Sequence, residues 1–443
     1  MYHMQAVRVE SADAINLENC EISHTGNNGI FITDAENYSI ENNVFEDIGF
    51  TGVYVQYYAN KKGKNVKINK NTFNGMGMSN LYTPACIMVG GEKNVEVANN
   101  DCKNNPSTGI HVRGAMENGP DFKGYAYEVR NNRIDKTGLG ILNDYGVIKL
   151  TALPPKGSRD KFKREHAGCQ LATKMNLQFF TTPECTAGFL RKHQFAHAHI
   201  YKNLLMEAKP YHNGGNCIYS DVATSKTHFD GNICYGPWKH ANAFYHHCGI
   251  ENESTNNVVY RRAPPTEELE VRPVNRLWYN NIWGGCERQR VITEGIIQEY
   301  TNEKNIYLME DYTGLQFMRF WDTFENVTFK NNIYWSTNMS GTQEKMFRNV
   351  DKPSKTVNWK EWKNLRDGTN DPNSLWADPM FVNAKNMNFK LKPGSPAVKL
   401  GFKDVSLNWI PALNAQTKRH KNKLQTNANK MKSYLRKNNR MLL

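Results

Sequence analysis

The feature that most constrains the fold of this chain is a six-residue segment with an Asn at its fourth place, which recurs along the sequence. The segments are IENNVF (40–45), INKNTF (68–73), VANNDC (97–102), VRNNRI (129–134), IYKNLL (200–205), FDGNIC (229–234) and FKNNIY (329–334). Neighbouring Asn positions are 28, 29, 32 and, later, 29 residues apart. A repeat of this period predicts a solenoid in which each repeat is one coil.

Each repeat contains two or three β-rich pieces joined by Asn and Gly corners, without helical periodicity between them. Asn and Gly suit such corners because both tolerate the left-handed backbone conformation, and stacked Asn side chains can form hydrogen-bonded ladders. The leucine pattern of leucine-rich repeats is missing. The sequence therefore predicts an all-β fold, a single-stranded right-handed parallel β-helix over residues 1–405 that lacks its N-terminal cap.

The formal net charge of +13 is concentrated in two segments. Residues 151–195 carry eight Lys and Arg against three acids, and residues 406–443 carry nine Lys and Arg and no acid, which leaves the rest of the chain at about −1. We expect a basic insertion of uncertain structure at 151–195 and a basic, disordered tail at 406–443. A neutral body argues against a nucleic-acid partner.

The sequence gives only weak signals about the cellular compartment of the protein. The chain has no apolar run of eighteen residues that would span a bilayer, and its nine Cys show no zinc spacing. The N-terminal residues have no apolar signal segment and enter strand-like sequence directly. We therefore expect a soluble chain without a metal, and either an intracellular protein or an incomplete chain, of which the repeats favour the second.

A second recurring element sets the register of one face. It reads GIFIT (29–33), GVYVQ (52–56), CIMVG (86–90), GIHVR (109–113), GILND (140–144), CIYSD (217–221) and AFYHH (243–247). If the apolar second residue points inward, strand alternation turns the third and fifth residues outward. The first outward column is then Phe31, Tyr54, Met88, His111, Leu142, Tyr219 and Tyr245, and the second is Thr33, Gln56, Gly90, Arg113, Asp144, Asp221 and His247.

In the second column two carboxylates become neighbours. With 151–195 looped out, Asp144 and Asp221 come from consecutive coils, about 4.8 Å apart, with Arg113 below and His247 above. Two carboxylates at this spacing couple, which is what acid–base and nucleophilic glycoside chemistry requires. We predict catalytic roles for Asp144, Asp221 and His247, with the order of the two acids open.

The flanking side chains are candidates for substrate binding. Aromatic and basic groups beside the acids are suited to sugar rings, and they are Arg113, His111, Tyr219, Tyr245 and His246. The alternative is that outward Asp residues are solvated surface charges, that Arg113 is a surface ion-pair partner, and that Phe31 and Tyr54 pack under a loop.

Several longer stretches resemble the pectate-lyase-like superfamily of right-handed β-helices, and in particular glycoside hydrolase family 141. They are YTPACIMVGG (82–91), LNDYGVIKL (142–150), GGNCIYSDVATS (214–225), NAFYHHCGIENESTNNVVY (242–260) and SLWADPMFVNAKNMNFKLKPGSPAVKLGF (374–402). The resemblance implies a secreted enzyme of the α-L-fucosidase or xylanase type, whose two catalytic aspartates match Asp144 and Asp221. Val222 and Tyr245 depart from the family pattern, and Pro154 to Phe195 matches nothing in it.

Three functions remain open at this point. The first is a monomeric glycoside hydrolase acting on a polysaccharide or oligosaccharide. The second is a polysaccharide lyase or uronate epimerase, in which Arg113, or Ca²⁺ held by the aspartates, neutralises the uronate carboxylate. The third is an inactive carbohydrate-binding β-helix. We expect no nucleic-acid partner, no membrane partner, and no cofactor unless Ca²⁺ serves a lyase.

Overall fold

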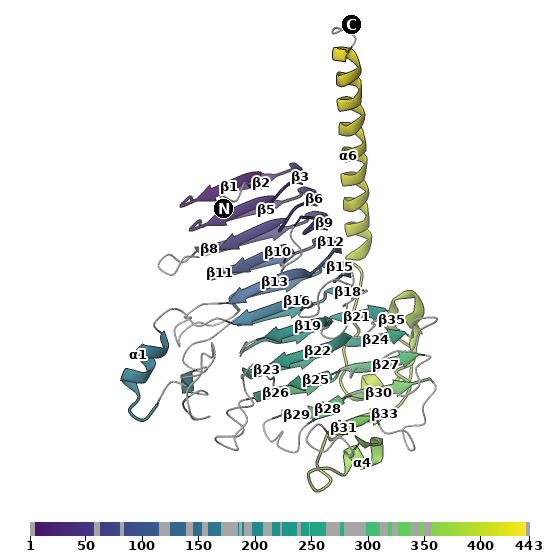
Figure 1. The fold of residues 1–443 in the computed structure, drawn as a ribbon. Coiled ribbons are helices and arrows are strands. Elements are labelled where there is room, and N and C mark those ends of the chain that lie inside the picture. The colour runs from purple at the N-terminus through teal and green to yellow at the C-terminus, as the bar shows by residue number, and fades with distance from the viewer. Residues whose placement is uncertain are drawn as a thin grey trace.

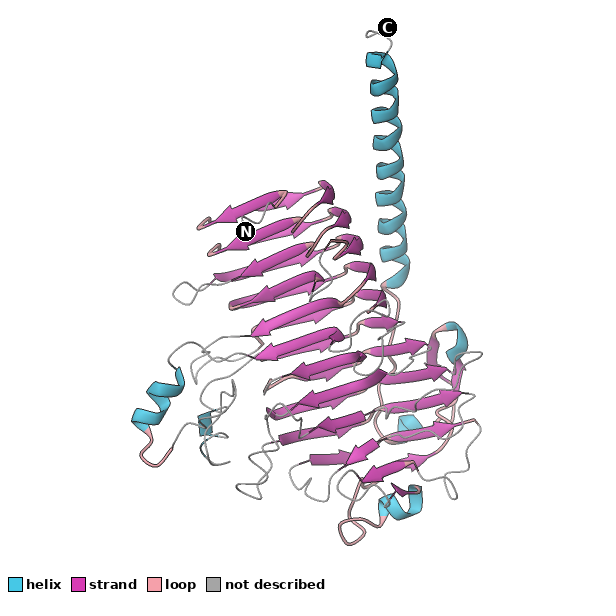
Figure 2. Ribbon diagram, viewed as in Figure 1, coloured by secondary structure: helices cyan, strands magenta, loops and turns pink. Residues whose placement is uncertain are grey.

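The computed structural model shows a solenoid of stacked coils from which one long helix projects (Figure 1). Strands make up most of it and helices are few (Figure 2). The structure describes residues 5–56, 63–79, 84–114, 125–138, 145–152, 158–169, 185, 188–189, 197–206, 215–221, 224–236, 241–247, 249–262, 275–278, 298–310, 318–320, 327–337, 346–349 and 356–439. The prediction of a right-handed parallel β-helix is confirmed.

The described strands form three long sheets, one on each face of the solenoid. Sheet 1 consists of β1 (Val7–Glu10), β4 (Ile30–Thr33), β7 (Val53–Gln56), β10 (Ala85–Gly90), β13 (Thr108–Gly114), β16 (Tyr145–Ala152), β19 (Gly215–Asp221), β22 (Ala241–His247), β25 (Asn275–Trp278), β28 (Met318–Phe320), β31 (Phe347–Asn349) and β32 (Thr356–Val357). Sheet 2 consists of β2 (Asn16–Glu18), β5 (Tyr38–Glu41), β8 (Gly63–Asn69), β11 (Glu92–Ala98), β14 (Tyr127–Arg130), β17 (Ala198–Tyr201), β20 (His228–Asp230), β23 (Gly249–Thr255), β26 (Gln298–Glu303) and β29 (Val327–Lys330).

Sheet 3 completes each coil. It consists of β3 (Glu21–Thr25), β6 (Val44–Ile48), β9 (Thr72–Met76), β12 (Asp101–Asn105), β15 (Arg133–Thr137), β18 (Leu204–Met206), β21 (Ile233–Gly236), β24 (Val258–Arg262), β27 (Ile306–Glu310), β30 (Ile333–Ser336) and β33 (Leu375–Trp376). Neighbouring strands are parallel throughout, except where β32 closes sheet 1 in an antiparallel pair with β31. The inward side chains of all three sheets form one apolar core.

The core is bordered by a ladder of buried Asn side chains at the corner before sheet 3. All seven Asn positions of the repeat lie in this ladder, and Asn257 and Asn305 belong to it as well. Most members accept, on one side-chain oxygen, the backbone N–H and side-chain amide of the Asn in the preceding coil. Each coil is thereby held in register with the next.

The residue before each ladder Asn turns the corner. It adopts the left-handed conformation in nine coils, at Asn42, Lys70, Asn99, Asn131, Lys202, Gly231, Asn256, Lys304 and Asn331. Asn and Gly tolerate this conformation at low cost. Three of the nine are Lys, so the ladder hydrogen bonds hold this conformation even for an unfavourable residue.

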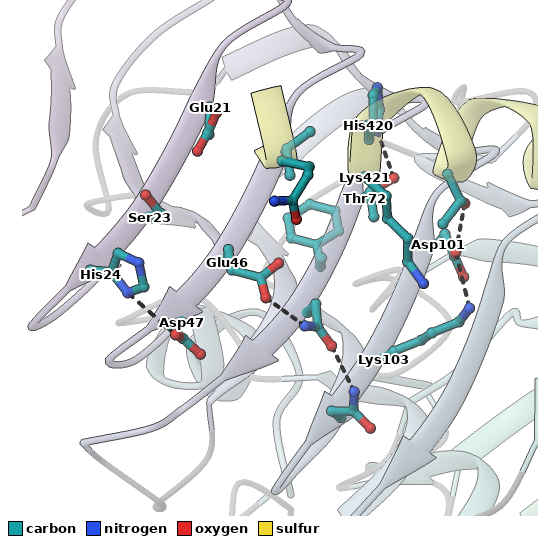
Figure 3. Close-up of a pocket in the computed structure, with 16 residues that line it drawn as sticks. Glu21, Ser23, His24, Glu46, Asp47, Thr72, Asp101, Lys103, His420 and Lys421 are labelled. Atoms are coloured by element: carbon teal, nitrogen blue, oxygen red, sulfur yellow. Dashed lines mark hydrogen bonds and ion pairs between the residues drawn. The ribbon is translucent and has the colours of Figure 1, made fainter. Parts of the chain in front are cut away.

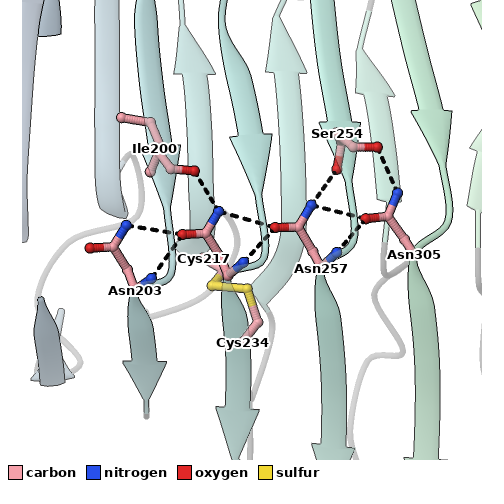
Figure 4. The surroundings of a disulfide bond; sticks show 8 residues. Ile200, Asn203, Cys217, Cys234, Ser254, Asn257 and Asn305 are labelled. Carbon is pink, nitrogen blue, oxygen red and sulfur yellow. Dashed lines mark hydrogen bonds between the residues drawn. A yellow bond between two sulfur atoms is a disulfide. The ribbon is translucent and has the colours of Figure 1, made fainter. Parts of the chain in front are cut away.

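Disulfide bonds close individual coils. Cys86–Cys102 joins β10 to β12, and Cys217–Cys234 joins β19 to β21, so each links sheet 1 to sheet 3 within one coil. Figure 4 shows the second bond beside the Asn ladder. A third bond, Cys169–Cys185, lies in the insertion. The sequence did not predict this pairing.

The insertion and the C-terminal segment differ from the predicted boundaries. β16 continues to Ala152, and β17 begins at Ala198, so the insertion starts two residues later than predicted. Its described part contains α1 (Ser158–Glu165). After the last coil come α4 (Trp359–Lys363), the hairpin β34 (Phe381–Asn383) and β35 (Asn388–Leu391), with the 3₁₀ turn Ala384–Asn386 between them, and α5 (Pro396–Lys399).

The expectation of a disordered tail is wrong, because the chain continues into the long helix α6 (Ile410–Asn439). Three polar side chains at helical spacing attach it to sheet 3. Gln416 donates to the carbonyl of Lys70 (2.7 Å), the Thr417 hydroxyl to Asp101 (2.8 Å), and His420 Nδ1 lies 2.7 Å from Thr72 Oγ1. The nine positive charges alone predict disorder, but this polar face provides contacts that hold the helix against the solenoid. No helix in the described part of the chain is both long and apolar enough to cross a membrane.

The ladder makes a testable prediction about stability. The Asn132 side chain accepts from Asn100 and donates to Asn203 and to the Val97 carbonyl. Asn132→Ala leaves these buried groups without partners, and we expect the free energy of unfolding to fall by about 3 kcal/mol or more. The matched control is Asn16→Ala, an exposed Asn with one hydrogen bond from Ser39. Urea unfolding that gives equal losses for both variants would contradict the role of the ladder.

Candidate active site on sheet 1

The candidate site lies on the outer face of sheet 1, where β13, β16, β19 and β22 run side by side in the middle of the solenoid (Figure 1). The observed pairing gives the first outward column as Phe31, Tyr54, Met88, His111, Lys149, Tyr219 and Tyr245. The predicted column is therefore correct in all coils but one. In that coil Lys149 stands where Leu142 was expected.

The same coil corrects the predicted carboxylate pair. Thr151 pairs with both Arg113 and Asp221, so the column position assigned to Asp144 belongs to Thr151. Asp144 itself lies outside the described residues, and so does Leu142. The strand from Tyr145 to Thr151 spans six residues, about 20 Å. The position beside Asp221 that the sequence predicted for Asp144 is therefore held by Thr151, at the far end of the strand from Tyr145.

The error arose from two similar segments seven residues apart. Both GILND (140–144) and VIKLT (147–151) have an apolar residue at the second and a polar residue at the fifth place. Spacing from the preceding ladder Asn does not separate them, because Ile110 follows Asn100 by ten residues and Ile87 follows Asn71 by sixteen. The deciding factor is the pairing of Ile148 with Ile110 and Ile218, a contact between coils that the local pattern does not encode.

Asp221 ends β19 and is held by two neighbours. The Tyr219 hydroxyl donates to Asp221 Oδ1 at 2.9 Å, and Lys149 Nζ forms an ion pair with Asp221 Oδ2 at 3.0 Å. The same ammonium group lies 4.7 Å from the centre of the Tyr219 ring. All three side chains are buried, with Asp221 only 7% exposed. The charge of Asp221 is therefore compensated by fixed contacts, which excludes the reading as a solvated surface charge.

His111 and Arg113 add two further nitrogen groups below this pair. His111 is buried, and its Nε2 lies 3.0 Å from Thr151 Oγ1. Burial, and then the cations of Lys149 and Arg113, lower the pKa of His111 well below its usual value, against the opposing effect of Asp221. His111 is therefore neutral at pH 7. Arg113 is half-buried, with Nη1 3.9 Å from the sulfur of Met88.

The remaining candidates lie on β22. Tyr245 pairs with Tyr219, and His247 ends the strand, but the side chains of both are outside the described residues. His246 does not lie on the outer face of sheet 1, because strand alternation turns it inward. It is 1% exposed, and its ring packs against Phe229 and Tyr300.

The first part of the column supports structural roles for its aromatic side chains. Phe31 and Tyr54 meet edge to face, with ring centres 5.5 Å apart, and Arg8 covers Phe31. The two rings therefore pack against each other and against Arg8, and the alternative that they pack under a loop stays a prediction. Within the described residues, no group of three or more His, Cys, Asp or Glu is placed to hold a metal ion.

A further hollow lies on another face of the solenoid. A groove of about 1160 Å³ separates the outer face of sheet 3 from α6, and its walls carry polar side chains such as Glu21, Glu46, Asp101 and Lys421 (Figure 3). The Asp101 carboxylate in this groove forms ion pairs with Arg133 and Lys103. We place the candidate active site on sheet 1, because the buried, mutually bonded ionisable groups converge there.

The fold and this site define a right-handed parallel β-helix protein with a basic cluster around one carboxylate. Residues 5–152 match the family model described as the right handed beta helix region. A solved structure titled "Glycoside hydrolase" is similar, with 13% identity, 88% of this chain covered and a TM-score of 0.27. The match covers 40% of that chain, so the present chain corresponds to less than half of it. A search of curated proteins found no match.

The inward position of His246 makes a prediction about acid stability. Burial lowers the pKa of His246 from 6.5 to about 3. The unfolded chain therefore binds a proton below pH 6.5 that the folded chain does not, and stability falls as the pH drops toward 3. By pH 4 this amounts to about 3 kcal/mol. We expect His246→Phe to lose less stability between pH 7 and pH 4 than the parent chain in urea unfolding. The exposed His24 gives the control His24→Phe, and an equal pH dependence in all three proteins would refute the assignment.

Proposed function

We propose that the protein is an enzyme that acts on a polysaccharide containing uronic acids, and that it cleaves the chain by β-elimination. The observation that carries this proposal is the grouping of Lys149, Arg113 and a neutral His111 around Tyr219 and Asp221 on one sheet face. Cationic groups neutralise the carboxylate of a uronate, which acidifies the proton on the neighbouring carbon. A neutral imidazole is the form that accepts such a proton.

Each group has a role in the proposed reaction. Arg113 and Lys149 bind the uronate carboxylate, and His111 removes the proton from C5. The C5–H electron pair forms the C4–C5 double bond as the bond from C4 to the glycosidic oxygen breaks, and the Tyr219 hydroxyl protonates that oxygen. The Lys149 ammonium beside the Tyr219 ring stabilises the developing phenolate. Asp221 positions both Lys149 and Tyr219.

Hydrolysis is the second candidate, favoured by the buried Asp221 at the end of β19, where the resemblance to glycoside hydrolase family 141 implies a catalytic aspartate. The ion pair of Asp221 with Lys149 suits a nucleophile or base rather than an acid. The partner carboxylate would then come from outside the described part of the chain.

We also propose that the protein is exported. The disulfides in two separate coils and in the insertion suit an oxidising compartment, and plant-type or microbial polysaccharides are met outside the cell. This agrees with the secreted enzyme that the family resemblance implies.

The chemistry is tested by the products. With polygalacturonate and related acidic polymers as substrates, we expect an unsaturated product that absorbs in the ultraviolet. Arg113→Gln, Tyr219→Phe and Asp221→Asn should each lower kcat/KM by about 100-fold or more. Asp230→Asn, on the outer face of sheet 2, is the matched carboxylate control. New reducing ends without ultraviolet absorbance would establish hydrolysis instead, and binding without turnover would establish a carbohydrate-binding protein.

The acid limb of the pH profile tests His111 as the base. Since its pKa is lowered, we expect kcat/KM to hold at pH 6.5 and to fall only at lower pH. Removing one of the cations that lower this pKa should raise it, so the residual activity of Arg113→Gln should fall at a higher pH than that of the parent enzyme. Asp230→Asn should leave the limb in place. If the activity of Arg113→Gln fell at the same pH as that of the parent enzyme, His111 would be excluded as the titrating group.

A further inference from the structure

The C-terminal seventh of the chain carries a formal charge equal to the net charge of the whole protein, because the basic insertion is balanced by acidic residues elsewhere. Residues 384–443 contain 14 Lys and Arg and a single acid, Asp404, so their formal charge is +13. The preceding 383 residues contain equal numbers of basic and acidic side chains. A neutral solenoid therefore continues into a strongly cationic segment, which we call the C-terminal module.

Part of this charge surrounds a surface pocket. The pocket has a volume of about 690 Å³ and is formed by β34, β35, the turn Pro393–Ser395 and α5. Lys390, Lys392 and Lys399 line it together with Asp404, whose side chain accepts from the backbone N–H of Leu391. The apolar side chains of Val382 and Val398 are 43% and 59% exposed at the same pocket. Ammonium groups beside exposed aliphatic side chains suit a sugar acid, which has a carboxylate and apolar C–H groups.

The rest of the charge lies on α6. Among the described side chains, Lys418, Arg419 and Lys421 are exposed, while Gln416, Thr417 and His420 face sheet 3. The hydrogen bonds of these three inner side chains hold the helix against the solenoid, and Figure 1 shows it continuing beyond the first coil. The exposed basic side chains of α6 therefore lie on a helix whose first part is held against the solenoid.

We propose that the C-terminal module is a second binding site for an acidic polysaccharide, which holds the polymer while the site on sheet 1 acts on it. This inference rests on the proposed function for its choice of ligand. Nucleic acid is the other polyanion, but proteins bind its single strands by stacking bases on aromatic rings. The lining residues of the pocket present aliphatic side chains in that position. The disulfides also suit the proposed export to an oxidising compartment, where polysaccharides are met.

The test compares charge-neutralised versions of the full chain. One variant combines Lys390→Gln, Lys392→Gln and Lys399→Gln, and a second combines Lys418→Gln, Arg419→Gln and Lys421→Gln. The control combines Lys67→Gln, Lys136→Gln and Lys202→Gln, three exposed Lys on the neutral solenoid. Binding to immobilised polygalacturonate, to a neutral β-glucan and to single-stranded DNA is measured at about 50 and about 200 mM salt, together with cleavage of a short oligogalacturonate.

We expect each module variant to bind polygalacturonate roughly tenfold more weakly at low salt, with a salt slope reduced by about two. The control should match the parent, and the neutral glucan should bind none of the proteins through the module. Equal affinity of module variants and control would overturn the inference, as would tighter binding of DNA than of polygalacturonate at matched charge. Failure of the proposed function appears separately, as absent cleavage of the oligogalacturonate while the module still binds polymer.

Discussion

The structure depends on the hydrogen bond between an Asn side chain of one coil and the backbone of the coil before it. A parallel sheet alone permits neighbouring strands to slip, and a slip of one residue exchanges the inner and outer faces. The buried Asn ladder removes this freedom, because each amide has partners at only one register. The columns of side chains on sheet 1, including those of the candidate site, keep their alignment because this corner is fixed.

Much of the fold follows from local sequence. The Asn repeat predicted the solenoid, and the alternation around Ile30, Val53, Ile110 and Ile218 predicted which residues face outward. Asn257 and Asn305 occupy the same ladder, but the sequence did not predict them because their flanking residues differ from the repeated six-residue pattern. The solenoid and its outward residues were both predictable because every coil has the same local geometry.

The candidate site was less predictable, because it depends on which of two similar segments pairs with the neighbouring coils. The pairing of VIKLT with the neighbouring coils places Lys149 and Thr151 in the cluster, at the column positions that the sequence predicted for Leu142 and Asp144. This changes the chemistry from two coupled acids to an acid compensated by a cation, beside a neutral imidazole. The helical tail was missed for a related reason: its attachment to Asp101 and Thr72 joins segments more than 300 residues apart.

The two solenoid disulfides have a mechanical consequence. Cys86–Cys102 and Cys217–Cys234 each close a loop inside a single coil, so they brace the cross-section of the solenoid and cross no boundary between coils. Along the axis of the solenoid the coils are held together by non-covalent contacts, chiefly strand pairing, the Asn ladder and core packing. A pulling force along the axis would therefore separate coils one after another from the end of the solenoid. A coil that contains a disulfide would keep its covalent loop closed after it separates.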